Sequence, residues 1–201
     1  YRLAAAYPLS EHWYTKVLYG TSFKAPSSVQ LYTTLIVPQG VLGNPDLRPE
    51  EARTWEAAIG GRLGRGLTVT FIGFSSEVTD KVELVPSGAN TRADNVAKIS
   101  SHGFEEETFY RGDRSTAYLN LSYQSSTERR VDRLRGVLEG DTNLYPTTTV
   151  KFGGSRQLQR WPWEVSLAGV YIGERIASEQ NIKTHDPINL EEYTLDGYLL
   201  L

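Results

Sequence analysis

The sequence predicts an all-β fold, specifically an antiparallel transmembrane β-barrel segment. Three observations carry this prediction: residues that alternate between apolar and polar, connections that alternate between short and long, and aromatic residues near strand ends. The 201 residues have a net charge of −3 and a mean hydropathy of −0.39, averages that are typical of a soluble protein. A membrane barrel shares these averages because only every second residue of a strand meets lipid. The order of the residues therefore decides the fold class.

Residues 115–124 show the alternation most clearly. Ala117, Leu119, Leu121 and Tyr123 are apolar, whereas the residues between them, such as Asn120, are polar. A period of two puts the apolar side chains on one face of a β-strand and the polar ones on the other. About nine strands are expected on this basis, at residues 1–7, 13–19, 54–60, 67–76, 96–110, 115–124, 148–154, 163–171 and 193–201.

The connections between these strands alternate in length. The expected short connections are residues 8–12, 63–66, 111–114 and 159–162. The expected long connections are residues 22–48, 80–92, 126–145 and 177–192. Tight turns at one rim and long loops at the other are typical of outer-membrane barrels, in which the short turns face the periplasm.

Aromatic residues give an independent indication. Trp and Tyr prefer the two membrane interfaces, where an apolar ring and a polar edge are both satisfied. Three tryptophans flank short connections, namely Trp13, Trp161 and Trp163. Three tyrosines lie at the opposite ends of their strands, away from the short connections, namely Tyr19, Tyr123 and Tyr171. One strand fits less well, because residues 105–107 are all Glu and must turn at least one carboxylate toward lipid.

Several classes of function are disfavoured by the residues themselves. No Cys is present, which excludes disulfides, thiolate metal sites and Cys nucleophiles, and no basic excess favours nucleic acid. His12, His102 and His185 are far apart and match no metal-ligand spacing. No motif of a hydrolase, a P-loop or a zinc protease occurs. We therefore expect neither an enzyme nor a resident metal or cofactor.

Three motifs carry a family resemblance. Residues 23–26 read Phe-Lys-Ala-Pro, residues 44–51 read Asn-Pro-Asp-Leu-Arg-Pro-Glu-Glu, and an Asn-Val pair at residue 95 precedes Gly-Phe-Glu at residues 103–105. This pattern resembles the TonB-dependent receptors, which have a Phe-Arg-Ala-Pro box and an Asn-Pro-Asn-Leu box. Here Lys24 replaces Arg and Asp46 replaces Asn. The resemblance covers most of the chain.

The resemblance implies that residues 1–201 are the C-terminal part of a barrel with 22 strands and an N-terminal plug domain. The plug and the last strand or strands are expected to lie outside this chain. The whole protein would be a receptor and transporter of the bacterial outer membrane, which takes up a scarce ligand with energy from the TonB complex. Haem receptors of the family place a His between the two boxes, and residues 27–43 contain none, so a ferric siderophore or another metal complex is favoured.

Partners and alternatives follow from the same resemblance. The expected partners are the TonB complex, the receptor's own plug domain, outer-membrane lipids and lipopolysaccharide, and a small-molecule ligand, with no nucleic acid. A passive porin shares every barrel feature and lacks only the boxes. An outer-membrane enzyme would need a catalytic cluster at one rim, and a soluble β-sandwich would not need the alternation of loop lengths.

Two sets of candidate site residues result. Seven polar residues are expected to face the barrel interior or its plug: Tyr14, Lys16, Lys24, Glu50, Glu56, Tyr118 and Asn120. Four residues are candidates for ligand contact: Tyr32, Arg129, Arg130 and Arg133. Within the first set, a charge pair between Lys24 and Glu50 near the rim is expected to have a structural role rather than to contact the ligand. An arginine-rich loop such as that around residue 130 suits an anionic ligand or outer-leaflet phosphates.

Overall fold

The computed structural model describes residues 1–34, 40–132, 136–141, 146–173 and 192–200. Nine strands form one continuous antiparallel sheet, in the order β1 (Arg2–Pro8), β2 (Trp13–Lys24), β4 (Glu50–Gly64), β5 (Leu67–Ser87), β6 (Asn90–Arg111), β7 (Ser115–Asp132), β9 (Thr148–Gln157), β10 (Glu164–Ile172) and β11 (Glu192–Leu200). Every neighbour along this path is antiparallel. The expected fold and strand count are therefore confirmed.

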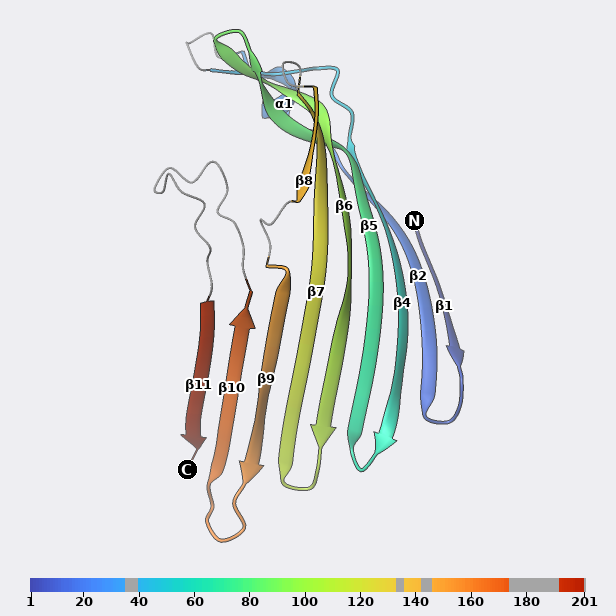
Figure 1. Cartoon of the computed structure of the whole chain (residues 1–201), viewed down its shortest axis with the longest axis vertical. Helices are drawn as coiled ribbons and strands as arrows, with labels where there is room; N and C mark the ends of the chain where they lie inside the picture. Colours follow the sequence, from blue (N-terminus) through green and yellow to red (C-terminus); the bar gives the residue numbers. More distant parts are fainter. Residues whose placement is uncertain (35–39, 133–135, 142–145, 174–191, 201) are drawn as a thin grey trace.

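The sheet is open and curved, with β1 at one edge and β11 at the other (Figure 1). The four connections that were expected to be short lie at one end of the sheet, which we call the short-turn end. Three small elements lie at the other, long-loop end: α1 (Ser28–Tyr32), β3 (Val41–Leu42), which pairs with β6 in parallel, and β8 (Gly136–Asp141), which pairs with β7. No helix in the described part of the chain is long and apolar enough to span a membrane.

The register joins the alternation of single strands into two continuous faces. Directly paired residues of an antiparallel ladder point to the same side, so Leu119 shares a face with Phe152, and Ile59 shares it with Thr15 and Phe71. We call this the apolar face; its other members include Val17, Ala57, Val69, Leu121, Val150, Val165 and Leu167. The opposite side is called the polar face. In a transmembrane barrel the apolar face is the one that meets lipid.

Aromatic residues border the apolar face at both ends. At the long-loop end, Tyr19 pairs with Trp55 at a ring centroid distance of 4.4 Å, and Phe104 pairs with Tyr123 at 5.6 Å. At the short-turn end, the rings of Trp161 and Trp163 lie 5.5 Å apart, and Trp13 begins β2. The structure thus shows both expected aromatic rows and adds Trp55 and Phe104 to the row at the long-loop end.

Two expected long loops are strands instead. Residues 80–92, expected as a loop, belong to a hairpin in which β5 and β6 continue to a tight turn at Gly88, which has φ of +63°. Residues 126–145 were expected as a loop as well, but β7 runs on to Asp132 and β8 returns along it, with residues 133–135 and 142–145 outside the described part. These expectations were wrong because a strand that extends beyond the membrane needs no apolar face. Its sequence therefore lacks the apolar–polar alternation from which strands were predicted. The expected loop at 177–192 lies outside the described residues except for Glu192, which begins β11.

The Glu run in β6 turns one carboxylate to the apolar face, as expected. Glu106 pairs in register with Phe71 and Leu121 and accepts a hydrogen bond from the Thr108 hydroxyl. Glu105 and Glu107 face the polar side. The hydroxyl partner compensates part of the cost of placing a carboxylate among apolar neighbours.

Glycines in the wall make room for aromatic rings from neighbouring strands. Gly60 is paired with Tyr14, and a Cβ at this glycine would lie 2.6 Å from the Tyr14 hydroxyl oxygen. Gly153 is paired with Tyr118, and a Cβ there would lie 2.7 Å from its ring. Both rings therefore lie flat against the wall on the polar face, over a position that only glycine leaves free.

The buried apolar core is small because a barrel wall has lipid on one side and its interior on the other. Among the described residues it consists of Leu47, Val69, Val85, Ala93 and Ala97, with Asn44 as the buried polar residue. All of these except Val69 lie at the long-loop end, where the first long loop contacts the β5–β6 hairpin through Asn44 and Ala93. The sites described next are built around that contact.

Candidate functional site

The first long loop is fastened to the β5–β6 hairpin by Asn44, which is only 4% exposed. Its amide nitrogen Nδ2 donates to the Ala93 carbonyl at 3.1 Å, and its Oδ1 accepts from Arg92 Nη2 at 2.8 Å. The same Oδ1 accepts from the Asp46 backbone at 3.1 Å, which closes the turn at Pro45. Leu47, 9% exposed, packs into the same junction. The second sequence box is thus a joint between two chain segments.

A second contact lies beside it, at a bulge in β5. Asn95 Oδ1 accepts from the Arg48 backbone nitrogen at 2.9 Å, and its Nδ2 donates to the carbonyls of Arg48 at 3.0 Å and of Asp80 at 2.6 Å. The Asp80 carboxylate in turn pairs with Arg48 Nη2 at 2.6 Å. Asp80 has φ of +56°, at the register shift between Val78 and Lys81. The Asn-Val pair of the third sequence motif therefore meets the second motif directly.

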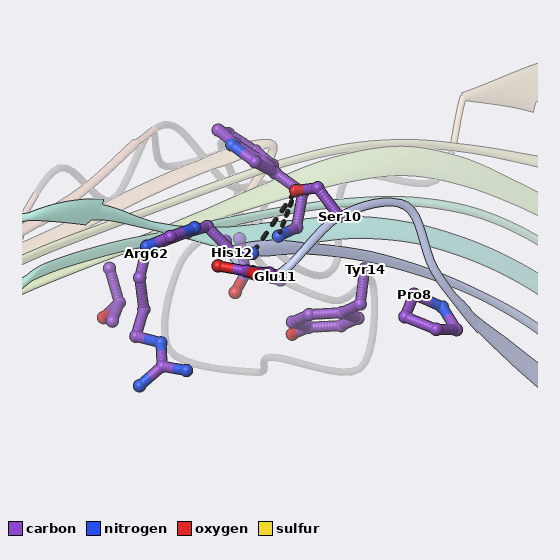
Figure 2. Close-up of a pocket in the computed structure, with 10 residues that line it drawn as sticks. Pro8, Ser10, Glu11, His12, Tyr14 and Arg62 are labelled. Carbon is purple, nitrogen blue, oxygen red and sulfur yellow. Dashed lines mark hydrogen bonds between the residues drawn. The ribbon is translucent and has the colours of Figure 1, made fainter.

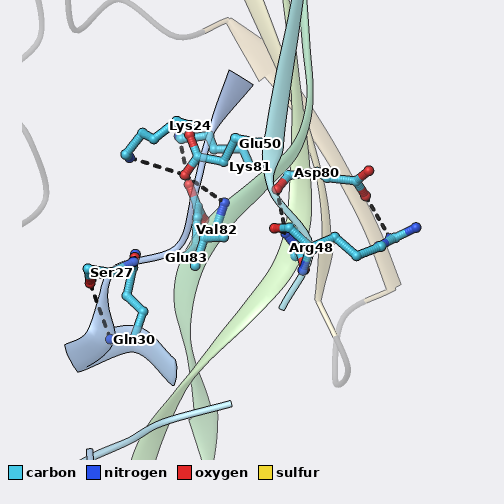
Figure 3. A network of polar contacts seen from close by, with 10 residues as sticks. Lys24, Ser27, Gln30, Arg48, Glu50, Asp80, Lys81, Val82 and Glu83 are labelled. Carbon is cyan, nitrogen blue, oxygen red and sulfur yellow. Dashed lines mark hydrogen bonds and ion pairs between the residues drawn. The ribbon is translucent and has the colours of Figure 1, made fainter. Parts of the chain in front are cut away.

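The expected charge pair between Lys24 and Glu50 is present, with 3.2 Å between Nζ and Oε1 (Figure 3). The same Oε1 accepts from the Val82 backbone nitrogen at 3.3 Å. Lys24 is 69% exposed, so the ion pair itself contributes little. The carboxylate of Glu50, 14% exposed, links the ends of β2 and β4 to the part of β5 above the bulge.

Four further charged residues connect the upper parts of β5 and β7. Lys81 Nζ lies 2.8 Å from Glu83 and 3.4 Å from Glu128, and Arg130 Nη1 lies 3.2 Å from the other oxygen of Glu83. We call these residues the upper charge cluster. They lie beyond Tyr123 and the aromatic row, and hence outside the membrane-spanning segments. This cluster could not be predicted from the sequence, because the strand register brings together residues that are 47 positions apart in the chain, such as Lys81 and Glu128 or Glu83 and Arg130.

The two carboxyl groups of the upper charge cluster differ in pKa. Burial raises the pKa of Glu128 above its ordinary value, and the hydrogen bond with Glu83 and the charge of Glu83 add to this effect. Burial acts in the same direction on Glu83, but its hydrogen bonds with Lys81 and Glu128 and the charges of Lys81 and Arg130 outweigh it, so the pKa of Glu83 is lowered. Burial lowers the pKa of Lys81, yet the two glutamates raise it overall.

The seven residues expected to face the interior or plug all lie on the polar face. Lys16 and Glu56 come from β2 and β4, whereas Tyr118 and Asn120 come from β7, and the register places all of them on the same side. Tyr14 belongs to this side by its pairing with Gly60, and Lys24 by its pairing with Glu50. Whether this face contacts a plug stays a prediction.

Sequence reasoning missed three charged residues of the same face: Glu105, Glu107 and Lys151. They line a cavity of about 310 Å³ together with Asn120. Within the part of the chain that the structure describes, no ion pair or side-chain hydrogen bond engages Glu105, Glu107 or Lys151. The alternation within residues 103–110 is the sequence signal that places Glu105 and Glu107 on the polar face, opposite Glu106. Unpaired charges on an inner wall are suited to contact a further polar surface.

A larger hollow of about 570 Å³ lies at the short-turn end of the polar face (Figure 2). It is lined by Tyr14 and Arg62 from the wall and by Glu11 and His12 from the first short turn. Ser10 Oγ holds this turn by accepting from the backbone nitrogens of His12 at 3.3 Å and Trp13 at 3.2 Å. No group of three His, Asp or Glu side chains among the described residues is arranged to hold a metal ion.

The four candidates for ligand contact do not converge on one place. Tyr32, 66% exposed, ends the short helix α1, which a capping box between Ser27 and Gln30 begins. Arg129 and Arg130 are successive residues of β7 and point to opposite faces, and Arg130 is engaged by Glu83. Arg133 lies outside the described residues. A role in ligand contact stays a prediction for each of them.

The geometry agrees with a comparison across known families. All of residues 1–201 match the family model described as "TonB dependent receptor-like, beta-barrel". The chain belongs to the TonB-dependent receptor family. The expected family is thereby confirmed, and with it the location in the outer membrane of Gram-negative bacteria. Members of this family are transport receptors.

Solved structures of TonB-dependent receptors show the same fold. The ferric-catecholate import receptor Fiu from E. coli K12, in its closed form, matches with a TM-score of 0.72 at 17% identity, over 98% of this chain and 28% of that one. The FrpB iron transporter from Neisseria meningitidis (F3-3 variant) matches at 0.66 and 15%, over 98% and 29%. The pyoverdine receptor FpvA from Pseudomonas aeruginosa PAO1, bound to pyoverdine, matches at 0.67 and 16%, over 98% and 28%. This chain thus spans less than a third of these receptors.

Proposed function

We propose that the complete protein is an outer-membrane receptor that takes up a scarce ligand by energised transport, and that the ligand is a ferric siderophore or another metal complex. The observation that carries this proposal is the match of the whole chain to the TonB-dependent receptor barrel. Similar structures carry names that refer to iron, ferric catecholate and pyoverdine, which supports this ligand class. No catalytic step is assigned to the chain.

In this proposal residues 1–201 form a late part of the wall of a 22-stranded barrel, and a plug domain fills its interior. The polar face supports a contact with the plug, since it presents the unpaired charges of Glu105, Glu107 and Lys151. The same face carries Glu56 and Asn120, which the sequence predicts to face the interior or the plug. A plug that prefers one position when the ligand is bound and another when TonB pulls on it would couple energy to passage. Lipid and lipopolysaccharide would surround the apolar face.

The experiment uses the full-length receptor in iron-limited cells with and without TonB. The probes are iron-55 loaded onto a catecholate siderophore, a hydroxamate siderophore and citrate. We expect at least one probe to be bound at 4 °C in both strains and taken up at 37 °C only in the strain with TonB. Uptake that is equal in both strains would show a passive porin and contradict energised transport. Binding of none of the three, while a non-iron substrate is taken up through TonB, would contradict the ligand class.

A further inference from the structure

Arginines gather at the short-turn end of the sheet. Six of them lie at or beside the short turns: Arg62, Arg65, Arg111, Arg114, Arg156 and Arg160. Three carboxylates share this end, namely Glu11, Asp113 and Glu164. No lysine is among the cations, although the chain has lysines elsewhere. A net positive rim is notable in a chain whose total charge is −3.

Among the described residues no carboxylate pairs with these arginines, and the one charge contact is that of Arg111, whose guanidinium carbon lies 5.6 Å from the centre of the Phe109 ring. All six are exposed, and none of them takes part in an ion pair or side-chain hydrogen bond with the described residues. The cations of the long-loop end behave differently: Arg48, Arg53, Lys98 and Arg130 each pair with a carboxylate. Unpaired cations are therefore more frequent at the short-turn end, although Arg129 and Lys151 also have no ion pair with the described residues.

Three of the six arginines lie around the tryptophan pair at the lower ends of β7, β9 and β10. Arg156 is paired in register with Val165 and so lies on the apolar face. The Arg114 carbonyl accepts from the Gln157 backbone nitrogen at 2.9 Å, which places Arg114 beside the end of β9. Arg160 belongs to the turn that carries Trp161, whose ring is tilted against that of Trp163 with 5.5 Å between the ring centres. Cationic and aromatic residues thus lie in neighbouring turns and strand ends where the apolar face ends.

We propose that Arg114, Arg156 and Arg160, with Trp161 and Trp163, form a binding site for the phosphate of anionic phospholipids in the inner leaflet of the outer membrane. The short turns of outer-membrane barrels face the periplasm, so this rim lies at the level of the inner-leaflet headgroups. The guanidinium fork donates two parallel hydrogen bonds to a phosphate, which a lysine does not do. Tryptophan rings settle at the same interface, with the ring in the acyl region and the indole N–H among the headgroups.

The test measures lipid bound to the purified full-length receptor by native mass spectrometry, with phosphatidylglycerol and phosphatidylcholine as probes. The variant R114Q/R156Q/R160Q is expected to bind phosphatidylglycerol at least about tenfold more weakly, with phosphatidylcholine unchanged. The matched control R53Q/K98Q/R129Q removes the same charge from the long-loop end and is expected to bind phosphatidylglycerol as the natural receptor does. The variant R114K/R156K/R160K keeps the charge and is expected to recover binding in part. Millimolar inorganic phosphate is expected not to displace the lipid.

Three results would overturn the proposal. If R114Q/R156Q/R160Q binds phosphatidylglycerol normally, the arginines serve another partner, such as an acidic segment of a periplasmic protein. If the control loses as much lipid as the rim variant, the effect is one of overall charge and not of this site. If inorganic phosphate displaces the lipid, the site binds free phosphate. Heat modifiability on a detergent gel tests whether each variant has folded. The variant R114K/R156K/R160K serves as a folded comparison that keeps the positive charge.

Discussion

Replacing Asn95 by Asp tests the joint between the second and third sequence motifs. The substitution keeps the shape of the side chain and the Oδ1 that accepts from the Arg48 backbone at 2.9 Å. It removes both donations from Nδ2, to the carbonyls of Arg48 at 3.0 Å and Asp80 at 2.6 Å, and turns a carboxylate toward two carbonyl oxygens. Two lost hydrogen bonds at a half-buried site are worth about 2 kcal/mol. We expect the loop to detach locally while the barrel stays folded.

Hydrogen exchange of the full-length receptor measures this detachment. The reporters are the backbone amides of Asn44, Leu47 and Val82, which donate to Gln30, Asn44 and Glu50 respectively. A local free-energy change of about 2 kcal/mol raises the exchange rate of these amides roughly 30-fold. Peptides from β10, far along the sheet, are expected not to change.

Asn90→Asp is the matched control, since it makes the same chemical change in the same strand. Within the described residues, the side chain of Asn90 makes one hydrogen bond, in which Oδ1 accepts from the Gly40 backbone nitrogen at 3.2 Å, and Asp retains this acceptor. We expect a rate change of less than about threefold. Equal effects of the two substitutions, or no effect of Asn95→Asp, would refute the reasoning that the Nδ2 donations hold the loop.

Two further predictions concern the wall and the upper charge cluster. Gly153→Ala is expected to push the Tyr118 ring off the wall and to cost about 1–3 kcal/mol of stability, measured as a lower temperature of heat modification on gels. Gly73→Ala is the control, since a Cβ there would meet nothing within 4 Å, and it is expected to change that temperature little. Equal shifts for the two variants would contradict this account. Glu83 has a lowered pKa, so its contribution is present at neutral pH and lost on acidification, and Glu83→Gln is expected to increase hydrogen exchange in residues 81–83 at pH 7. Glu128 has a raised pKa, so its contribution to stability is present at acidic pH and lost as the pH rises. Glu128→Gln is therefore expected to leave the hydrogen exchange of residues 81–83 unchanged at pH 7. A larger effect for Glu128→Gln than for Glu83→Gln would contradict these directions of the two pKa shifts.

The membrane-spanning part of the fold was predictable from the sequence. Lipid on one side forces a period of two, so Leu119 and Leu121 revealed the apolar face without any knowledge of their neighbours. The interfaces constrain Trp and Tyr in the same way, which is why Trp13 and Tyr19 indicated both borders of the membrane.

The long-loop end was predicted poorly for a physical reason. Beyond the membrane a strand needs no apolar face, so the extension of β5 to Ser87 had no periodic signal. Contacts such as Lys81 to Glu128 depend on a register that includes two shifts, at Val78 to Lys81 and at Lys81 to Val82. The pair of Lys24 and Glu50 was the exception, because both residues lie in recognisable motifs.

The measurement that tests the central claim most directly is a scan of spin labels along β7 of the full-length receptor, in a cysteine-free background. The central claim is that one face of this wall meets lipid and the other faces the barrel interior. Labels at residues 117, 119, 121 and 123 are predicted to be accessible to oxygen dissolved in the lipid, and labels at residues 118, 120, 122 and 124 are predicted to be shielded from it. Oxygen accessibility that does not alternate, or that peaks at the even-numbered residues, would contradict the account.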